Sequence, residues 1–144
     1  MDGVIVSPLK IIDVPGGDVL HAIKSKDQGF YGFGEAYFST IECRVVKAWK
    51  KHHQMVLNLV VPVGEVRFVL FNDQVQPSTK NQFFEIKLSQ SNYNRLTVPA
   101  GIWLGFQGLS VEKAIVLNIA SIPHDPDEVE RKLMNEIKYD WEIF

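Results

Sequence analysis

Lys50 and His52 are the residues of this sequence whose types and spacing best suit proton-transfer chemistry. Residues two positions apart in a β-strand point to the same face, so Lys50, His52 and Ala48 would share one side. Trp49 and Lys51 would take the other side. In a desolvated site the lysine could act as a base with a lowered pKa, and the histidine could donate or relay a proton near neutral pH. Two solvated side chains near a strand end would produce the same pattern.

Polar residues inside strand-like runs are candidates for binding a substrate. Asn58 interrupts the apolar run 56–61, where a buried amide needs a hydrogen-bond partner. It either lines a pocket or bonds to nearby backbone in a bulge. Glu35, Tyr37 and Ser39 share one strand face, and we take Glu35 and Tyr37 as candidate pocket residues. An exposed sheet surface fits that alternation equally well.

Two isolated histidines and one tryptophan have both a functional and a structural interpretation. His124 lies between Pro123 and Asp125 in a turn, where it is either a proton donor at a pocket mouth or a surface residue beside a helix cap. His21 lies in an alternating strand and is either a binding residue or a structural one. Trp103 could stack on a nucleobase or a sugar, but most aromatic residues of a small protein fill its core.

The composition is that of one globular protein and excludes several classes. The chain has 144 residues, of which 46% are hydrophobic, and a formal net charge of -2 without a polybasic run, so we expect no nucleic-acid partner. Cys43 is the only cysteine, which excludes an intrachain disulfide and fits a reducing cytoplasm. Neither a signal sequence nor a long apolar run is present, so we expect a soluble protein with no membrane partner.

The elements that must position these residues are mainly strands. Short β-branched and aromatic runs alternate with Pro, Gly, Asn and Asp turns, a pattern typical of an all-β protein with two sheets or a barrel. The predicted strands are residues 19–24, 30–40, 44–51, 56–61, 65–72, 83–88, 95–98, 102–108 and 114–121.

One helix is predicted near the end of the chain. Acidic residues at 125–128 are followed by Val129, Leu133 and Ile137 at spacings of four, which is typical of a short amphipathic C-terminal helix. No repeat or linker composition occurs, so residues 1–144 are predicted to form a single domain.

Two half-motifs resemble those of the cupin barrels. They are Lys50-Lys51-His52 followed by Gly64, and the run PAGIWL at 99–104. In metal-binding cupins these motifs contribute three His and one Glu, and the corresponding positions here are Lys50, His52, Leu57 and Leu104. A transition metal needs three or four converging donors, so no metal and no cofactor are expected.

Among metal-free cupins the chain resembles the dTDP-4-dehydrorhamnose 3,5-epimerase family over roughly residues 15–142. The stretches that carry the likeness are GDVLH (17–21), GFGEAYF (32–38), VKAWKKH (46–52), PAGIWLGF (99–106), IPHDPDE (122–128) and YDW (139–141). The resemblance implies a cupin-type jelly-roll barrel, also called a double-stranded β-helix, a homodimer, and a deoxythymidine diphosphate sugar as substrate. In that family a His held by an Asp removes protons beside the C4 keto group, and a Tyr returns one from the opposite face.

The chain departs from this pattern at several positions. Lys50 stands where the family has its catalytic His, and Lys47 replaces a substrate-binding Arg, which keeps the charge but not the guanidinium fork. His21 lies where the family has an Arg that reaches the diphosphate. His124 lies near the position of the family's Tyr. The residue patterns and the resemblance together predict Lys50, His52 and His124 as catalytic residues, and as substrate-binding residues Lys47, His21, Asn58, Glu35, Tyr37 and Trp103.

Two functions fit the sequence. The first is an epimerase or isomerase acting on a dTDP-4-keto-6-deoxy sugar in surface-polysaccharide biosynthesis, with Lys50 as base and His52 as acid. A titratable pair in an apolar barrel is costly to desolvate without a use, which favours this reading. The second is a non-catalytic cupin that binds a nucleotide sugar or a carbohydrate. Fold likeness alone does not decide between them.

Overall fold

The architecture is nearly all β. The structure, a computed structural model, describes residues 1–74 and 82–142. The strands in these ranges are β1 (Ile5–Pro8), β2 (Ile11–Ile12), β3 (Val19–Leu20), β4 (Glu35–Ile41), β5 (Val46–His52), β6 (Leu57–Val63), β7 (Val66–Asn72), β8 (Gln82–Leu88), β9 (Asn94–Val98), β10 (Trp103–Gly108), β11 (Ala114–Ala120) and β12 (Val129–Arg131). Two 3₁₀ turns, η1 (Pro126–Glu128) and η2 (Met134–Glu136), flank β12.

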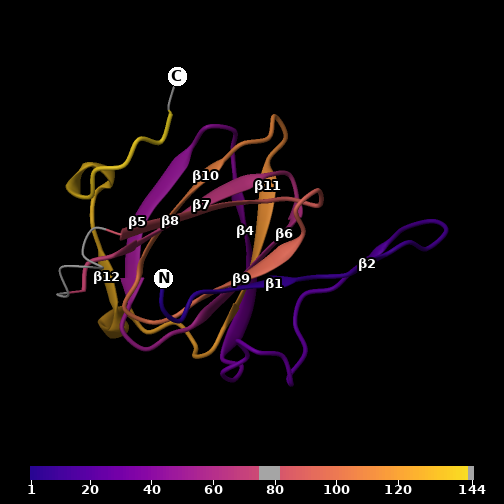
Figure 1. Cartoon of the computed structure of the whole chain (residues 1–144), viewed down its shortest axis with the longest axis horizontal. Helices are drawn as coiled ribbons and strands as arrows, with labels where there is room; N and C mark the ends of the chain where they lie inside the picture. Colours follow the sequence, from indigo (N-terminus) through magenta and orange to yellow (C-terminus); the bar gives the residue numbers. More distant parts are fainter. Residues whose placement is uncertain (75–81, 143–144) are drawn as a thin grey trace.

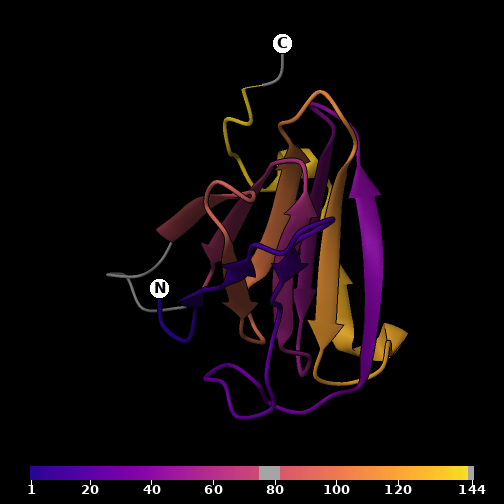
Figure 2. The ribbon, with the colours of Figure 1, turned by 90° about the vertical axis from the view of Figure 1, so that its right-hand side faces the viewer.

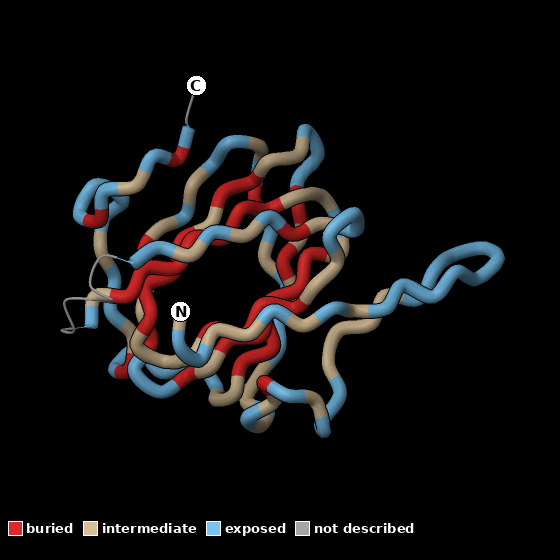
Figure 3. The backbone as a smooth tube through the Cα atoms, viewed as in Figure 1, coloured by how far each residue is buried: buried red, intermediate tan, exposed pale blue. Residues whose placement is uncertain are grey.

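Two five-stranded antiparallel sheets face each other. One has the strand order β1-β9-β6-β11-β4 and the other β12-β5-β10-β7-β8, while β2 and β3 form a two-stranded ribbon. The ribbon projects from the body of the molecule and is exposed (Figures 1 and 3). Buried positions, red in Figure 3, follow the strands of both sheets, and the view in Figure 2 shows β4 and β11 on the side away from β8. The sheets can therefore enclose a space between them.

The main core lies between the sheets. Its residues are the inward-pointing side chains at every second position along a strand, such as Leu57 and Leu59 on β6 and Phe68 and Leu70 on β7. Burial of such side chains contributes roughly 1.5–3 kcal/mol each. The alternation that predicted strands from the sequence thus marks the inner face of each sheet.

The C-terminal segment covers the outer face of the second sheet. Ile137 and Trp141 pack there on Val69, Phe71 and Trp103 in a second apolar cluster. This cover explains why all seven residues of β7 are buried. The Trp141 ring lies so close to β10 that a Cβ on Gly105 would be 2.9 Å from it. A side chain at position 105 would therefore displace the segment.

The all-β prediction is confirmed, but the predicted C-terminal helix is wrong. Val129 and Arg131 instead pair with the edge of β5, opposite His52 and Lys50. Leu133 is 70% exposed, so the spacing of four that suggested a helix does not mark a single buried face. Backbone pairing with an open sheet edge has overridden this weak local pattern. No helix in the described ranges has the length and apolarity to cross a membrane.

Candidate active site

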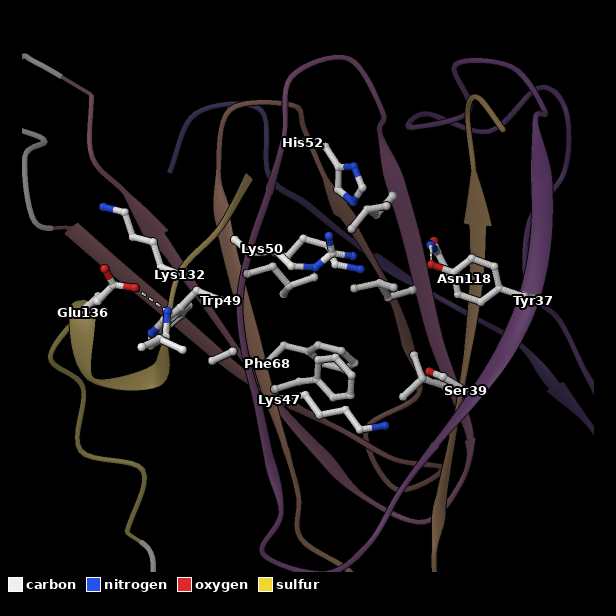
Figure 4. Close-up of a pocket in the computed structure, with 18 residues that line it drawn as sticks. Tyr37, Ser39, Lys47, Trp49, Lys50, His52, Phe68, Asn118, Lys132 and Glu136 are labelled. Carbon is white, nitrogen blue, oxygen red and sulfur yellow. Dashed lines mark hydrogen bonds between the residues drawn. The ribbon is translucent and has the colours of Figure 1, made fainter. Parts of the chain in front are cut away.

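A cavity of about 640 Å³ lies between the two five-stranded sheets. Its inner lining is apolar and includes Leu57, Phe68 and Leu104. Polar side chains line two opposing walls (Figure 4). One wall belongs to β5 and β12, and the other to β4 and β11. Leu57 and Leu104, which occupy cupin ligand positions, are part of this apolar lining.

The pocket side of β5 presents Lys47, Lys50 and His52. Ala48, which the alternation placed with Lys50, instead packs against the outer cluster, because the register of β5 against β10 shifts between these two residues. Lys51 points to the outer side, where its Nζ lies 3.6 Å from Asp73 and 3.4 Å from Glu130. The structure therefore places Lys50 and His52 together in the pocket, as period-two alternation predicts. Figure 4 shows both side chains projecting from the same strand.

His52 is held by a carboxylate that the sequence analysis did not select. Its Nδ1 forms a short hydrogen bond with Glu128 Oε1. The other oxygen of Glu128 accepts the backbone N–H groups of His53, Gln54 and Met55 at 3.0–3.2 Å. Glu128 is only 3% exposed. Its contacts thus tie η1 to the turn between β5 and β6.

The bonding of Glu128 fixes its charge. Burial alone would raise the pKa of the Glu128 carboxyl, but the hydrogen bonds from His52 and from the backbone of Gln54 and Met55 outweigh burial and lower that pKa. A carboxylate that accepts several N–H groups stays ionised. The ionised Glu128 therefore accepts a hydrogen bond from the N–H group at His52 Nδ1.

The imidazole of His52 is consequently neutral near pH 7 with one free nitrogen. Burial lowers the pKa of His52, and the charges of Lys50 and His124 add to that effect, while the hydrogen bond and charge of Glu128 oppose it. Because Nδ1 carries the proton donated to Glu128, the lone pair lies on Nε2. This is the tautomer that a general base requires.

A second positive group lies beside Lys50. Arg131 on β12 is the direct cross-strand partner of Lys50, and both line the pocket. Burial lowers the pKa of Lys50, the charge of Arg131 lowers it further, and Glu128 opposes both. Within residues 1–74 and 82–142, neither cation has an ion-pair partner. Two adjacent cations without a counter-ion favour an anion in the pocket.

The opposite wall carries hydroxyl and amide groups. Tyr37 and Ser39 lie on β4, and Asn118 lies on β11 directly opposite Tyr37. Asn118 Nδ2 donates to the Tyr37 hydroxyl oxygen at 3.0 Å. Lys47 Nζ donates to the carbonyl oxygen of Thr40 at 2.8 Å, and its side chain also lines the pocket. Four predicted site residues therefore meet in this cavity: Tyr37, Lys47, Lys50 and His52.

Asn58 and Trp103 lie outside the pocket. Asn58 Nδ2 donates to the carbonyl of Gly29 at 2.9 Å, and its oxygen accepts from Arg95 and Thr97. The amide thus holds the loop before β4 on the outer face of β6. Trp103 is 1% exposed and donates to Asp73 at 2.9 Å. Its ring is part of the outer cluster, which leaves no free face for a ligand.

His21, Glu35 and His124 also lie away from the main cavity. His21 lines a separate cavity of about 130 Å³ at the base of the β2–β3 ribbon. Glu35 begins β4, one strand repeat before Tyr37, and is not part of the lining. His124 is exposed in the loop before η1, near enough to His52 to affect its pKa. A substrate contact by these three residues stays a prediction.

Sequence reasoning missed Glu128, Arg131 and Asn118. Asn118 interrupts an apolar strand just as Asn58 does, so the same criterion would have found it. Glu128 and Arg131 were assigned to a helix, and only the pairing of β12 with β5 brings them to the pocket. No cluster of three or more His, Cys, Asp or Glu suited to a metal occurs among the described residues.

Known structures share this architecture over nearly the whole chain. A dTDP sugar isomerase from Desulfovibrio desulfuricans G20 is 35% identical, with 98% of this chain and 92% of that chain covered and a TM-score of 0.92. The chain belongs to the dTDP-sugar isomerase family. The resemblance drawn from the sequence motifs is thereby confirmed.

A solved structure and a curated protein resemble the chain at lower sequence identity. The dTDP-6-deoxy-D-glucose-3,5-epimerase RmlC from Legionella pneumophila, in complex with dTDP-4-keto-L-rhamnose, is 20% identical with a TM-score of 0.82 and covers 100% of this chain and 81% of its own. The spore coat polysaccharide biosynthesis protein SpsL of Bacillus subtilis is 22% identical over 132 residues, 92% of this chain and 87% of SpsL. No family model matches the chain.

Proposed function

We propose that this member of the dTDP-sugar isomerase family epimerises a dTDP-linked 4-keto-6-deoxy sugar by proton transfer next to the keto group. The observation that carries the proposal is the His52–Glu128 pair in the pocket, beside two cations that have no ion-pair partner in ranges 1–74 and 82–142. The Desulfovibrio relative is a dTDP sugar isomerase, and the Legionella structure holds a dTDP-linked keto sugar, which supports this substrate class. SpsL supports a place in surface-polysaccharide biosynthesis.

His52 is the better base of the predicted pair. Its neutral imidazole offers Nε2 to a C–H bond beside the carbonyl, and Glu128 stabilises the imidazolium that forms. The C–H electron pair moves to the C4 oxygen and gives an enolate. The sequence led us to expect Lys50 as base and His52 as acid, whereas the proposal makes His52 the base and gives Lys50 no proton to transfer.

Lys50 and Arg131 stabilise the enolate. Their charges are adjacent and unpaired within the described parts of the chain, and the Lys50 ammonium is partly desolvated. Cations fixed where negative charge develops are among the largest contributions to catalysis, and each donor of this kind is typically worth about 10²–10³ in rate. Lys47 and Tyr37 remain the proposed substrate contacts within the same pocket.

Incubation with dTDP-4-keto-6-deoxyglucose in heavy water tests the proposal. The expected result is deuterium at C3 or C5, detected by NMR, and a rate about 10²–10⁴-fold lower in His52→Gln. The matched control is His53→Gln, because His53 is the next residue and its side chain is 49% exposed with an ion pair to Glu130. Absence of deuterium with the native protein would contradict the enzyme reading.

The same substrate separates catalysis from simple binding. A non-catalytic binder would be stabilised without exchange, by about 2.7 kcal/mol at one hundred times its dissociation constant. Thermal unfolding with and without dTDP-4-keto-6-deoxyglucose measures this. If the protein showed no stabilisation and no exchange, both functions would be contradicted.

The assembly and compartment are also proposals. We take residues 1–144 as one domain and its two sheets as a cupin jelly roll, supported by the core that both sheets share.

We also propose a cytoplasmic homodimer. The free Cys43 supports the cytoplasmic compartment. Exposed aromatic residues on and before the edge strand β4 support the dimer, namely Tyr31, Phe33 and Phe38. Sedimentation equilibrium checks the dimer, and a monomer at micromolar concentration would contradict it.

A further inference from the structure

Epimerisation needs groups on both faces of the sugar ring. The proposed base and both cations lie on the wall formed by β5 and β12. From that wall alone, a proton taken from carbon can only return to the same face, and the configuration is kept. Inversion therefore requires an acid on the wall formed by β4 and β11.

Tyr37 and Asn118 are the hydrogen-bonded pair on that second wall. They are direct cross-strand partners, and both side chains point into the pocket across from Lys50 and His52 (Figure 4). The 3.0 Å bond runs from Asn118 Nδ2 to the Tyr37 oxygen. Because the tyrosine oxygen accepts this bond, its own O–H remains available to donate into the pocket.

Asn118 is buried and hydrogen-bonded in a way that holds the Tyr37 hydroxyl in place. It is 4% exposed, and within the described residues its Oδ1 has no hydrogen-bond partner. A buried amide with one free acceptor is costly unless a ligand completes it. Its N–H, directed at the Tyr37 oxygen, would stabilise the phenolate left after proton donation. Oδ1 can accept a hydroxyl of the substrate.

The other candidates for this acid fit less well. Ser39 is on the same face of β4, but an alcohol is a far weaker acid than a phenol. His124, expected from the sequence as a proton donor, lies outside the cavity lining and on the side of His52. Tyr37 is 43% exposed, so solvent can return a proton to it after each turnover.

We propose that Tyr37 is the catalytic acid that reprotonates the sugar on the face opposite His52, with Asn118 as its positioning residue. This inference rests on the proposed function. His52 takes the proton from C3 or C5, and the electron pair forms the enolate. The enolate carbon then takes the hydroxyl proton of Tyr37 as the C4 carbonyl re-forms. Tyr37 is left as phenolate and His52 as imidazolium, and water restores both by returning one proton and accepting one.

Tyr37→Phe tests the assignment by separating exchange from inversion. In heavy water with dTDP-4-keto-6-deoxyglucose, the wild type should show deuterium incorporation together with an inverted centre by NMR. The variant should still incorporate deuterium, because the His52 imidazolium exchanges with solvent and returns deuterium to the same face. Its inversion should fall by about 10²–10⁴-fold. A tyrosine with only a structural role would lower both rates together.

Two further variants serve as controls. Ser39→Ala on the same strand face should leave the ratio of inversion to exchange as it is in the wild type. Asn118→Leu should lower inversion more than exchange, since it removes the N–H that holds the Tyr37 oxygen. Circular dichroism and thermal unfolding check that each variant is folded.

The outcomes distinguish the two proposals. If the wild type inverts the centre and Tyr37→Phe inverts it at a similar rate, the Tyr37 assignment is wrong and the proposed function stands. Loss of both exchange and inversion in a folded Tyr37→Phe also overturns the assignment. If the wild type does neither, the proposed function fails and the assignment fails with it.

Discussion

Neighbouring residues of the same type have opposite surroundings on the two faces of β5. Lys50 faces the pocket beside Arg131 without an ion pair in the described parts of the chain, whereas Lys51 lies on the outer face between Asp73 and Glu130. The Lys51 ammonium also lies 4.9 Å from the centre of the Trp103 ring. One lysine is neutralised and stacked, and the other is left available for chemistry.

The two histidines that follow repeat the contrast. His52 is buried against Glu128, whose carboxylate is completed by backbone N–H groups, while His53 pairs with the half-exposed Glu130 at 3.0 Å. Strand alternation decides which member of each pair is enclosed. Residue type therefore says less about function here than the face on which the residue lies and the acid it meets.

The largest expected effect comes from removing the acid on the enclosed side. Glu128→Ala should lower the free energy of unfolding by about 3 kcal/mol, since it leaves buried backbone donors and His52 Nδ1 without their acceptor. Glu130→Ala is the matched control and should cost less than about 1 kcal/mol, because exposed ion pairs contribute little. Urea denaturation measures both. Equal losses would show that the two acids are equivalent and would remove the basis of the comparison.

The lysine pair should separate activity from stability. Lys50→Met should lower the deuterium-exchange rate by about 10²–10³-fold and leave stability within about 0.5 kcal/mol, because it removes a cation that lies beside Arg131 and has no ion pair with any described residue. Lys51→Met should keep the rate and lose about 1 kcal/mol of stability, through its lost ring contact and ion pairs. Exchange rates and urea midpoints of both variants are the measurements. A Lys51 variant that loses activity as strongly as the Lys50 variant would contradict the assignment.

Local pattern explains what was predictable from the sequence. The period of two along β5 needs only one strand, so Lys50 and His52 were assigned to one face before any tertiary contact was known. The side-chain amides of two asparagines show what strand alternation alone cannot predict. Asn58 and Asn118 both interrupt apolar strands, yet Asn58 is turned outward onto Arg95 and Asn118 inward onto Tyr37. Only the neighbouring strands and loops decide which face is the pocket.

The partners of the site could not be predicted because they depend on distant pairing. Glu128 lies 76 residues from His52 along the chain. Its acidic neighbours and the spacing of the apolar residues after it were those of a helix start, whereas the open edge of β5 takes this segment as β12. Arg131 enters the pocket by the same pairing. The charge arrangement of the site is thus a tertiary property, although the residues that it surrounds were visible in the sequence.

The smallest expected effect is on pH dependence, and it distinguishes His52 from His53. Burial lowers the folded-state pKa of His52 below its ordinary value of 6.5, so the unfolded chain binds a proton more readily than the folded one. Stability linked to His52 is therefore fully present above about pH 6.5 and is lost as the pH falls through the lower folded pKa. Over the same range the exchange rate should fall as Nε2 becomes protonated.

Glu128 acts in the same direction at lower pH, because its pKa is also lowered in the folded state. Urea denaturation of the native protein between pH 7 and pH 5 should show the decline, and His52→Gln should flatten it while His53→Gln leaves it unchanged. The range above pH 5 isolates the histidine, since Glu128 loses its charge only below its ordinary value of 4.5. A decline that persists in His52→Gln and disappears in His53→Gln would reverse the comparison, because the exposed histidine would then be the one whose protonation is coupled to folding.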